Sequence, residues 1–151
     1  MTASDDLEKI IVAAHVLTRV AALDTRNEAP SAQWRTLAIL AERGPLRVGD
    51  LAQLSRITQP GATRLVGTMA AQGLVVREPD PEDSRAVRVA ATAEGERAFA
   101  AWRRQLATAL LPRFDGLGDD EWEHLREAAR ILTARISPRR ADDNDTKETA
   151  Q

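Results

Sequence analysis

Residues 44–73 read GPLRVGDLAQLSRITQPGATRLVGTMAAQG and contain the clearest structural pattern in the chain. Their apolar spacing predicts a short helix from about Val48 to Leu54 and a second helix after the break at residues 55–57. Thr58 has the side chain of an N-cap, and Pro60 follows where a missing N–H has no consequence. Gly73 is placed as the residue that ends the second helix. The stretch therefore predicts a helix-turn-helix.

A change of period follows this motif. Leu74 to Glu78 and Val87 to Ala91 are short β-compatible runs, separated by the polar, proline-containing segment PDPEDSR at residues 79–85. Two such runs around such a loop predict a β-hairpin with a mobile tip. The order helix, turn, helix, strand, loop, strand indicates a winged helix-turn-helix.

Helical patterns flank this segment on both sides. Asp5 and Glu8 have the spacing of a capping box for a first helix, and Ser31 can cap a second one. Thr92 can cap a long fifth helix that Pro112 closes, and a sixth begins near residue 119. We expect a mainly α fold of six helices with a small β-hairpin wing. Residues 31–93 would form the winged lobe, 5–30 and 94–136 a helical dimerisation region, and 138–151 a disordered charged tail.

Composition limits the classes of function. The chain of 151 residues has no cysteine, which excludes disulfides, thiolate zinc sites and cysteine redox sensing. The acidic start is not a secretory signal, and the apolar run from Ile10 to Leu17 is too short to cross a bilayer, so we expect a cytoplasmic protein. The net charge of −2 argues against a wholly basic nucleic-acid binder. Between residues 46 and 76, however, arginines outnumber acids, which leaves room for a basic face on an acidic body.

The second helix of the motif carries side chains suited to base edges. Gln can pair with adenine, Arg with guanine, and Thr can meet a thymine methyl group. Arg85 lies at the hairpin tip, where a flexible cation can enter a narrow minor groove. Taken alone, polar residues on a helix face are usually a solvated surface, and the order of the whole segment is what favours DNA. The predicted DNA-contacting residues are Arg47, Arg56, Thr58, Gln59, Pro60, Thr63, Arg64, Thr68 and Arg85.

Residues 31–100 resemble the MarR family of transcription regulators, named for multiple antibiotic resistance. The resemblance rests on GPLRVGDLA at 44–52, TQPGATRLV at 58–66, GLVVR at 73–77, DPEDSRA at 80–86 and TAEG at 92–95, of which the wing segment with Asp83 and Arg85 is the most specific. It implies a homodimer with interleaved first, fifth and sixth helices, bound to an inverted-repeat operator as a repressor. Each recognition helix would enter a major groove of double-stranded DNA, and each wing arginine the adjacent minor groove.

One residue departs from the family pattern. The family often has an acidic residue where this chain has Gly67, and that acid can anchor a wing arginine. Glycine inside a helix also costs about 0.5–1 kcal/mol relative to alanine. We hypothesise that Gly67 gives a looser wing or a closer approach of the backbone to phosphate.

The resemblance also implies a crevice for a small aromatic or phenolic acid between the helices of the dimer and the DNA-binding lobe. A cation beside aromatic walls would suit an apolar carboxylate. Tryptophans at helical spacing are more often core residues, and this alternative stays open. The candidate ligand-binding residues are His15, Arg19, Trp34, Leu37 and Trp102.

Catalytic and metal sites find little support. His15 and His124 fall on the predicted first and sixth helices without any spacing typical of metal ligands, so we expect no catalytic residue, metal or cofactor. A winged-helix module that binds another protein instead of DNA remains the alternative. A small hydrolase is a third hypothesis, but no sequence motif identifies a catalytic nucleophile.

Overall fold

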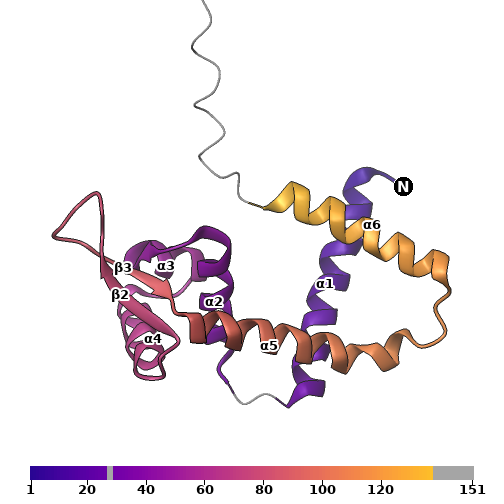
Figure 1. The fold of residues 1–151 in the computed structure, drawn as a ribbon. Coiled ribbons are helices and arrows are strands. Elements are labelled where there is room, and N and C mark those ends of the chain that lie inside the picture. The colour runs from indigo at the N-terminus through magenta and orange to yellow at the C-terminus, as the bar shows by residue number, and fades with distance from the viewer. Residues whose placement is uncertain (27–28, 138–151) are drawn as a thin grey trace, which may run out of the picture. The chain divides into compact units, whose positions relative to one another are not determined.

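The computed structural model describes residues 1–26 and 29–137 and divides the chain into two compact units, residues 1–115 and 116–151 (Figure 1). Within the described residues, the first unit holds five α-helices and a three-stranded sheet, and the second holds α6. The expected fold class, six helices with a small β wing, is confirmed. The functional division into a dimerisation region and a DNA-binding lobe stays a prediction.

Helix α1, Ala3–Thr25, begins two residues before the predicted start. The Thr2 hydroxyl accepts a hydrogen bond from the Asp5 backbone N–H at 3.3 Å, and the Asp5 carboxylate accepts one from the Thr2 N–H at 2.6 Å. This reciprocal pair is the capping box, in place of the predicted pair Asp5 and Glu8. These bonds to Thr2 hold the pKa of the Asp5 carboxyl below its usual value.

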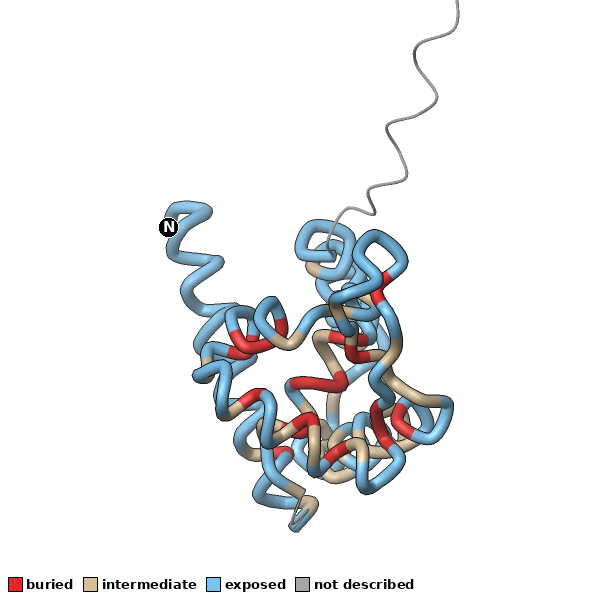
Figure 2. Tube along the Cα trace, turned by 90° about the vertical axis from the view of Figure 1, so that its left-hand side faces the viewer, coloured by how far each residue is buried: buried red, intermediate tan, exposed pale blue. Residues whose placement is uncertain are grey.

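Three helices enclose the main core of the first unit: α2 (Ser31–Arg43), α3 (Val48–Ser55) and α4 (Gln59–Ala71). Leu37 and Leu51 are buried between them, and Val66 and Met69 of α4 are fully buried, as is Val89 of the sheet. Figure 2 shows the buried residues in red. Each such side chain contributes about 1.5–3 kcal/mol by leaving water. This inner row fixes the rotation of α4 and so decides which of its residues face solvent.

The sheet has the strand order β1-β3-β2, all antiparallel, with β1 at Leu46–Arg47, β2 at Val75–Pro79 and β3 at Val87–Ala91. The last two strands form the predicted hairpin, whereas β1 was not predicted from the sequence. β1 joins the hairpin directly to the start of α3, because Leu46 lies opposite Val89 of the middle strand. The wing is therefore attached to the helix-turn-helix by strand pairing.

Helix α5, Ala93–Leu110, begins at the predicted cap, where Thr92 Oγ1 accepts from the Gly95 N–H at 3.0 Å. The Thr92 backbone N–H donates to Leu74 C=O at 3.0 Å, and its hydroxyl donates to Gly73 C=O at 2.5 Å. These bonds tie α5 to the end of the hairpin. Helices α1 and α2 pack against α5. Helix α5 is followed by the 3-10 helix Leu111–Phe114, which contains Pro112, the residue predicted to close α5.

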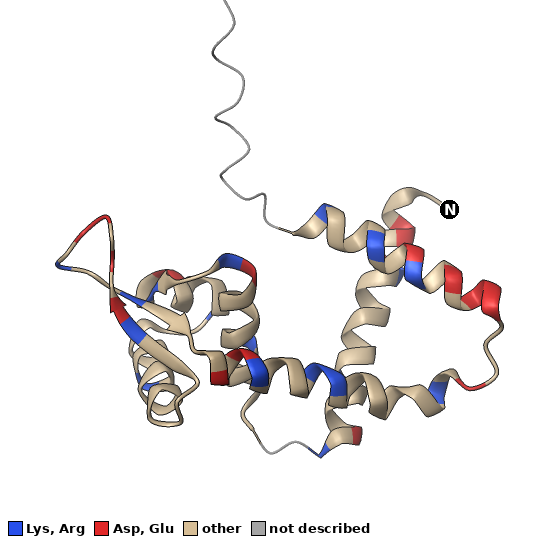
Figure 3. Ribbon diagram, in the orientation of Figure 1, with Lys and Arg blue, Asp and Glu red and all other residues tan. Residues whose placement is uncertain are grey.

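In the second unit, α6 runs from Asp119 to Ile136. Its first turn is acidic, with three carboxylates at the positive end of the helix dipole (Figure 3). Leu125, Ile131 and Ile136 of this helix are exposed. The predicted disordered tail, residues 138–151, lies outside the described residues.

Candidate nucleic-acid interface

The first turns of α4 present an exposed polar face. Thr58 Oγ1 accepts from the Gly61 N–H at 3.2 Å, so the predicted N-cap is confirmed. The residues that follow, Gln59, Pro60, Thr63 and Arg64, line one shallow hollow on the surface. Four of the five predicted contact residues on this helix thus share one side of it, opposite the buried row that begins at Ala62, and Thr68 does not line the hollow.

The turn between α3 and α4 contains a left-handed residue. Arg56 has φ 56° and ψ 42°, and its backbone N–H closes α3. A residue with a side chain pays about 1–2 kcal/mol for this conformation, which glycine adopts freely. The arginine side chain is exposed at the point where the motif turns. A cation is thus kept at a position whose backbone favours glycine.

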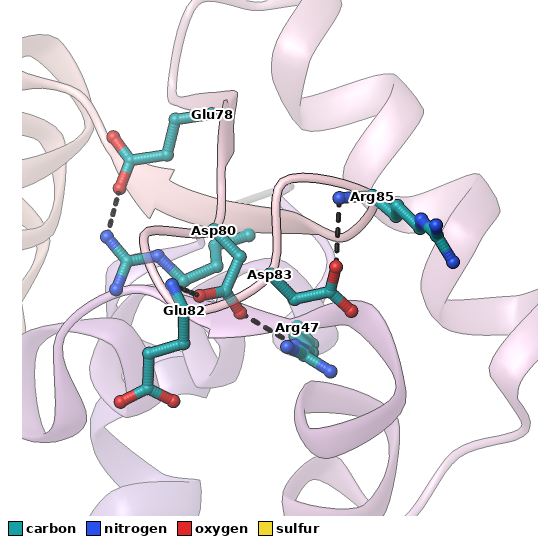
Figure 4. A network of polar contacts seen from close by, with 7 residues as sticks. Arg47, Glu78, Asp80, Glu82, Asp83 and Arg85 are labelled. Atoms are coloured by element: carbon teal, nitrogen blue, oxygen red, sulfur yellow. Dashed lines mark hydrogen bonds and ion pairs between the residues drawn. The ribbon is translucent and has the colours of Figure 1, made fainter.

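A network of ion pairs holds the base of the wing (Figure 4). Arg47 Nε donates to Asp80 Oδ2 at 2.7 Å, and the Glu82 backbone N–H donates to Asp80 Oδ1 at 2.9 Å. Arg88 pairs with Glu78 across the two strands at 2.9 Å. The Asp80 side chain is only 8 % exposed, so its charge is compensated inside the protein. Arg47, predicted as a DNA contact, is therefore also the anchor of the wing.

These contacts shift the ionisation of the pair. The Glu82 N–H, and next the Arg47 guanidinium, hold the pKa of the Asp80 carboxyl below its usual value. The same hydrogen bond and charge of Asp80 raise the pKa of Arg47. Both groups stay charged at neutral pH, so the ion pair between Arg47 and Asp80 persists there.

The tip of the wing differs from its base. The Arg85 backbone N–H donates to Asp83 Oδ1 at 3.0 Å, which closes the turn. The Arg85 side chain points away from the Arg47 and Asp80 pair in Figure 4 and forms no ion pair with any described residue. An arginine on a closed turn, next to a locked base, is suited to meet an external anion.

Comparison with known proteins identifies this arrangement. A family model for the MarR family matches residues 29–86, from α2 through most of the wing. An uncharacterised HTH-type transcriptional regulator of Mycobacterium leprae is 35 % identical over 100 residues, which cover 66 % of this chain and 70 % of the relative. The chain belongs to the MarR family. The predicted resemblance is confirmed.

Two further relatives agree with this assignment. The homoprotocatechuate degradative operon repressor of Escherichia coli is 30 % identical over 118 residues, covering 66 % of this chain and 80 % of the repressor. The structure of a MarR family protein from Bacillus stearothermophilus is 25 % identical, covers 89 % of this chain and 96 % of that one, and has a TM-score of 0.66. As a MarR protein, the chain is a DNA-binding transcription regulator of the HTH type and not an enzyme.

A second site in this MarR protein is an apolar pocket of about 380 Å³ in the first unit. The rings of Trp34 and Trp102 stack there at 4.9 Å between centroids, and Phe99 stacks on Trp102 at 5.9 Å. Trp34 Nε1 is buried without a hydrogen-bond partner among the described residues. The pocket is lined by Thr18, Ala22, Ala29, Ser31, Trp34, Arg35, Ala38, Phe99 and Trp102.

The structure brings together some of the predicted ligand-binding residues and not others. Trp34 and Trp102 meet in the pocket, as the ligand hypothesis requires. Leu37 is 1 % exposed and belongs to the hydrophobic core, because its position on α2 faces α3 and α4. His15 and Arg19 are exposed on α1 and do not line the pocket. The cation at the pocket is Arg35, which sequence reasoning missed because it is one exposed arginine among many.

Metal-ligand clusters and helices able to span a membrane are both absent from residues 1–26 and 29–137. No three His, Asp or Glu side chains gather there as ligands for a metal ion. No helix in that part of the chain is long and apolar enough to cross a membrane.

Proposed function

We propose that this MarR protein is a homodimeric repressor that binds an inverted-repeat operator in double-stranded DNA. The observation that carries the proposal is a contrast between paired and free groups. The wing base is internally paired, whereas the α4 face with Gln59 and Arg64 and the wing arginine Arg85 are open to solvent. The name of the Escherichia coli relative supports a repressor.

Exposed apolar residues support the homodimer. Helix α1 leaves Ile10, Val12, Val16 and Leu17 between 40 % and 56 % exposed, and the last three line an apolar groove of about 650 Å³. Helix α6 leaves Leu125, Ile131 and Ile136 exposed. An exposed apolar groove such as the one on α1 marks an interface with another chain. A second copy of the same chain would remove both helices from water.

The contact residues have separate roles in this proposal. Gln59, Thr63 and Arg64 would read base edges from the first turns of α4, where recognition helices meet bases. Arg85 would enter the minor groove, and Arg56 would meet a phosphate at the motif's turn. Arg47 would hold the wing with Nε and reach phosphate with its remaining N–H groups. Thr58, Pro60 and Thr68 would lie against the backbone of the duplex.

Fluorescence anisotropy tests the proposal on DNA from upstream of the protein's own gene, against a scrambled duplex, over a series of salt concentrations. We expect affinity for the upstream DNA at least about 10³-fold higher than for the scrambled duplex. Arg64→Ala should lose about 1–3 kcal/mol on the preferred site and relax its specificity. Arg85→Ala should weaken binding and reduce its salt dependence. Equal binding to both duplexes contradicts specific recognition, and no binding at low salt favours a protein-binding module.

We further propose that the pocket between α1, α2 and α5 binds a small aromatic acid that relieves repression. Its volume suits a small ligand, and the stacked rings of Trp34 and Trp102 offer apolar walls. The unpartnered Nε1 of Trp34 can donate to a ligand oxygen, and Arg35 supplies a positive charge at the pocket.

A hydrogen bond connects a residue of the pocket to the DNA-binding motif. Arg35 Nη1 donates to the C=O of Ser55 at 3.4 Å, and Ser55 is the last residue of α3, directly before the turn at Arg56. A ligand carboxylate would compete with this carbonyl for the guanidinium. Because the ligand would favour the state in which Arg35 leaves Ser55, it would change the population of the DNA-binding conformation.

A further inference from the structure

Gly67 leaves a gap in the exposed polar face of α4. In a helix of 3.6 residues per turn, the side-chain direction at position 67 is about 40° from that of Thr63 and about 60° from that of Arg64, between the two. It lies about 6 Å further along the helix axis than Thr63. Position 67 therefore continues the face that Gln59 begins, but glycine places no side chain there.

A side chain from the wing fills this gap. A Cβ built on Gly67 would have Arg77 Nη2 as its nearest neighbour, at 3.8 Å, so the guanidinium of Arg77 stands where a side chain of α4 would project. Arg77 is an exposed residue of β2, held in register opposite Val89. The polar face of α4 is thus extended by a cation that belongs to another element.

The guanidinium of Arg77 is not paired with an acidic side chain among the described residues. Its sequence neighbour Glu78 pairs with Arg88 at 2.9 Å, and Asp80 pairs with Arg47 at 2.7 Å. Within the described part of the chain, the Arg77 guanidinium forms no ion pair and no hydrogen bond. An acidic side chain at position 67 would lie against this group and neutralise it, and glycine leaves it free.

We propose that Arg77 is a phosphate-binding residue of the DNA interface, placed on the recognition face by the absence of a side chain at Gly67. This inference rests on the proposed DNA-binding function. Position 67 is in the third turn of α4, beyond the first turns that meet base edges. Arg77, which lies beside this position, would therefore contact the sugar–phosphate backbone. Arg77 therefore adds affinity without adding sequence preference.

The test compares Arg77→Gln with Arg97→Gln, which removes the same charge from the exposed face of α5. The Arg97 side chain is 71 % exposed and pairs only with its helical neighbour Glu94 in the described structure. Anisotropy is measured on the preferred site and on a scrambled duplex over a salt series. Thermal melts show whether each variant is folded.

Arg77→Gln should lower affinity about tenfold on both duplexes, and the slope of log K against log salt should shrink by about 0.9 per chain. Arg77→Lys should restore most of the affinity, because a phosphate accepts a point charge. Arg97→Gln should bind as the wild type does. If Arg77→Gln and Arg97→Gln bind alike while the wild type is specific, the role of Arg77 is wrong and the DNA-binding function stands. If the wild type binds neither duplex, both are wrong.

Discussion

Substitution of Gly95 by alanine should strongly destabilise the first unit. A Cβ at this position would lie far inside the contact distance of the Leu74 carbonyl oxygen, 3.0 Å from the carbonyl carbon and 3.3 Å from Leu37 Cδ2. The obstacle is backbone, so α5 must move away from the hairpin. That movement disturbs the two hydrogen bonds from Thr92 to the Leu74 and Gly73 carbonyls.

The size of the loss follows from these contacts. Overpacking that forces a backbone shift costs about 1–3 kcal/mol, and each of the two hydrogen bonds contributes about 1 kcal/mol. Alanine returns about 0.5–1 kcal/mol through its better helix propensity. The free energy of unfolding should therefore fall by about 3 kcal/mol, which corresponds to a decrease in Tm of roughly 10 °C.

The assay is thermal unfolding followed by circular dichroism at one protein concentration, because the Tm of a dimer depends on concentration. Gly67→Ala is the matched control, since its Cβ would lie 3.8 Å from Arg77 Nη2, an ordinary contact. This variant should gain about 0.5–1 kcal/mol of stability. A Gly95→Ala protein that melts within about 2 °C of the wild type would refute the argument from the close approach of Gly95 to the Leu74 backbone, directly before β2.

Three other predictions concern the interface and the pocket. Arg56→Gly should leave the free energy of unfolding unchanged or raise it by up to about 1 kcal/mol, because glycine adopts the left-handed backbone conformation without strain. Its DNA affinity should fall. A loss of both stability and DNA affinity would point to a purely structural role. The lowered pKa of Asp80 means that its ion pair stabilises the wing at neutral pH and is lost as pH falls below the usual carboxyl range. Asp80→Asn should abolish this part of the acid dependence of unfolding, and an identical acid profile would exclude it. Trp102→Ala should weaken the binding of small aromatic carboxylates, measured by calorimetry, by at least tenfold. Arg35→Gln should reduce the preference for a carboxylate over the matching amide. If both variants bind every ligand as the wild type does, the ligand does not bind in this pocket.

Local signals in the sequence predicted much of the fold because each acts within a few residues. The cap at Thr58, the helix-ending glycine Gly73 with φ 75° and the cap at Thr92 are all found in the structure. Strand β1 was missed, because two residues show no periodicity and pair only across the chain. The capping box of α1 was misplaced by three residues, since Thr2 and Asp5 have the same spacing as Asp5 and Glu8.

The candidate site was predictable where a residue acts alone and not where it acts through a distant partner. Gln59 and Arg64 follow from the helical face, which the apolar period defines. The pair of Arg47 with Asp80 joins residues 33 positions apart, and its geometry depends on the hairpin. The approach of Arg77 to α4 likewise depends on strand register, so glycine at position 67 showed only a missing side chain.

In the proposed function, the face of α4 reads a specific sequence in each half of a symmetric operator. In vitro selection from a random pool of duplexes, with the enriched DNA sequenced, shows whether the protein has such a preferred sequence. The wild type should enrich an inverted repeat whose half-sites are centred about one helical turn apart, and Arg64→Ala should enrich it less. A pool that stays random while the wild-type protein is folded and dimeric would contradict sequence-specific recognition by α4.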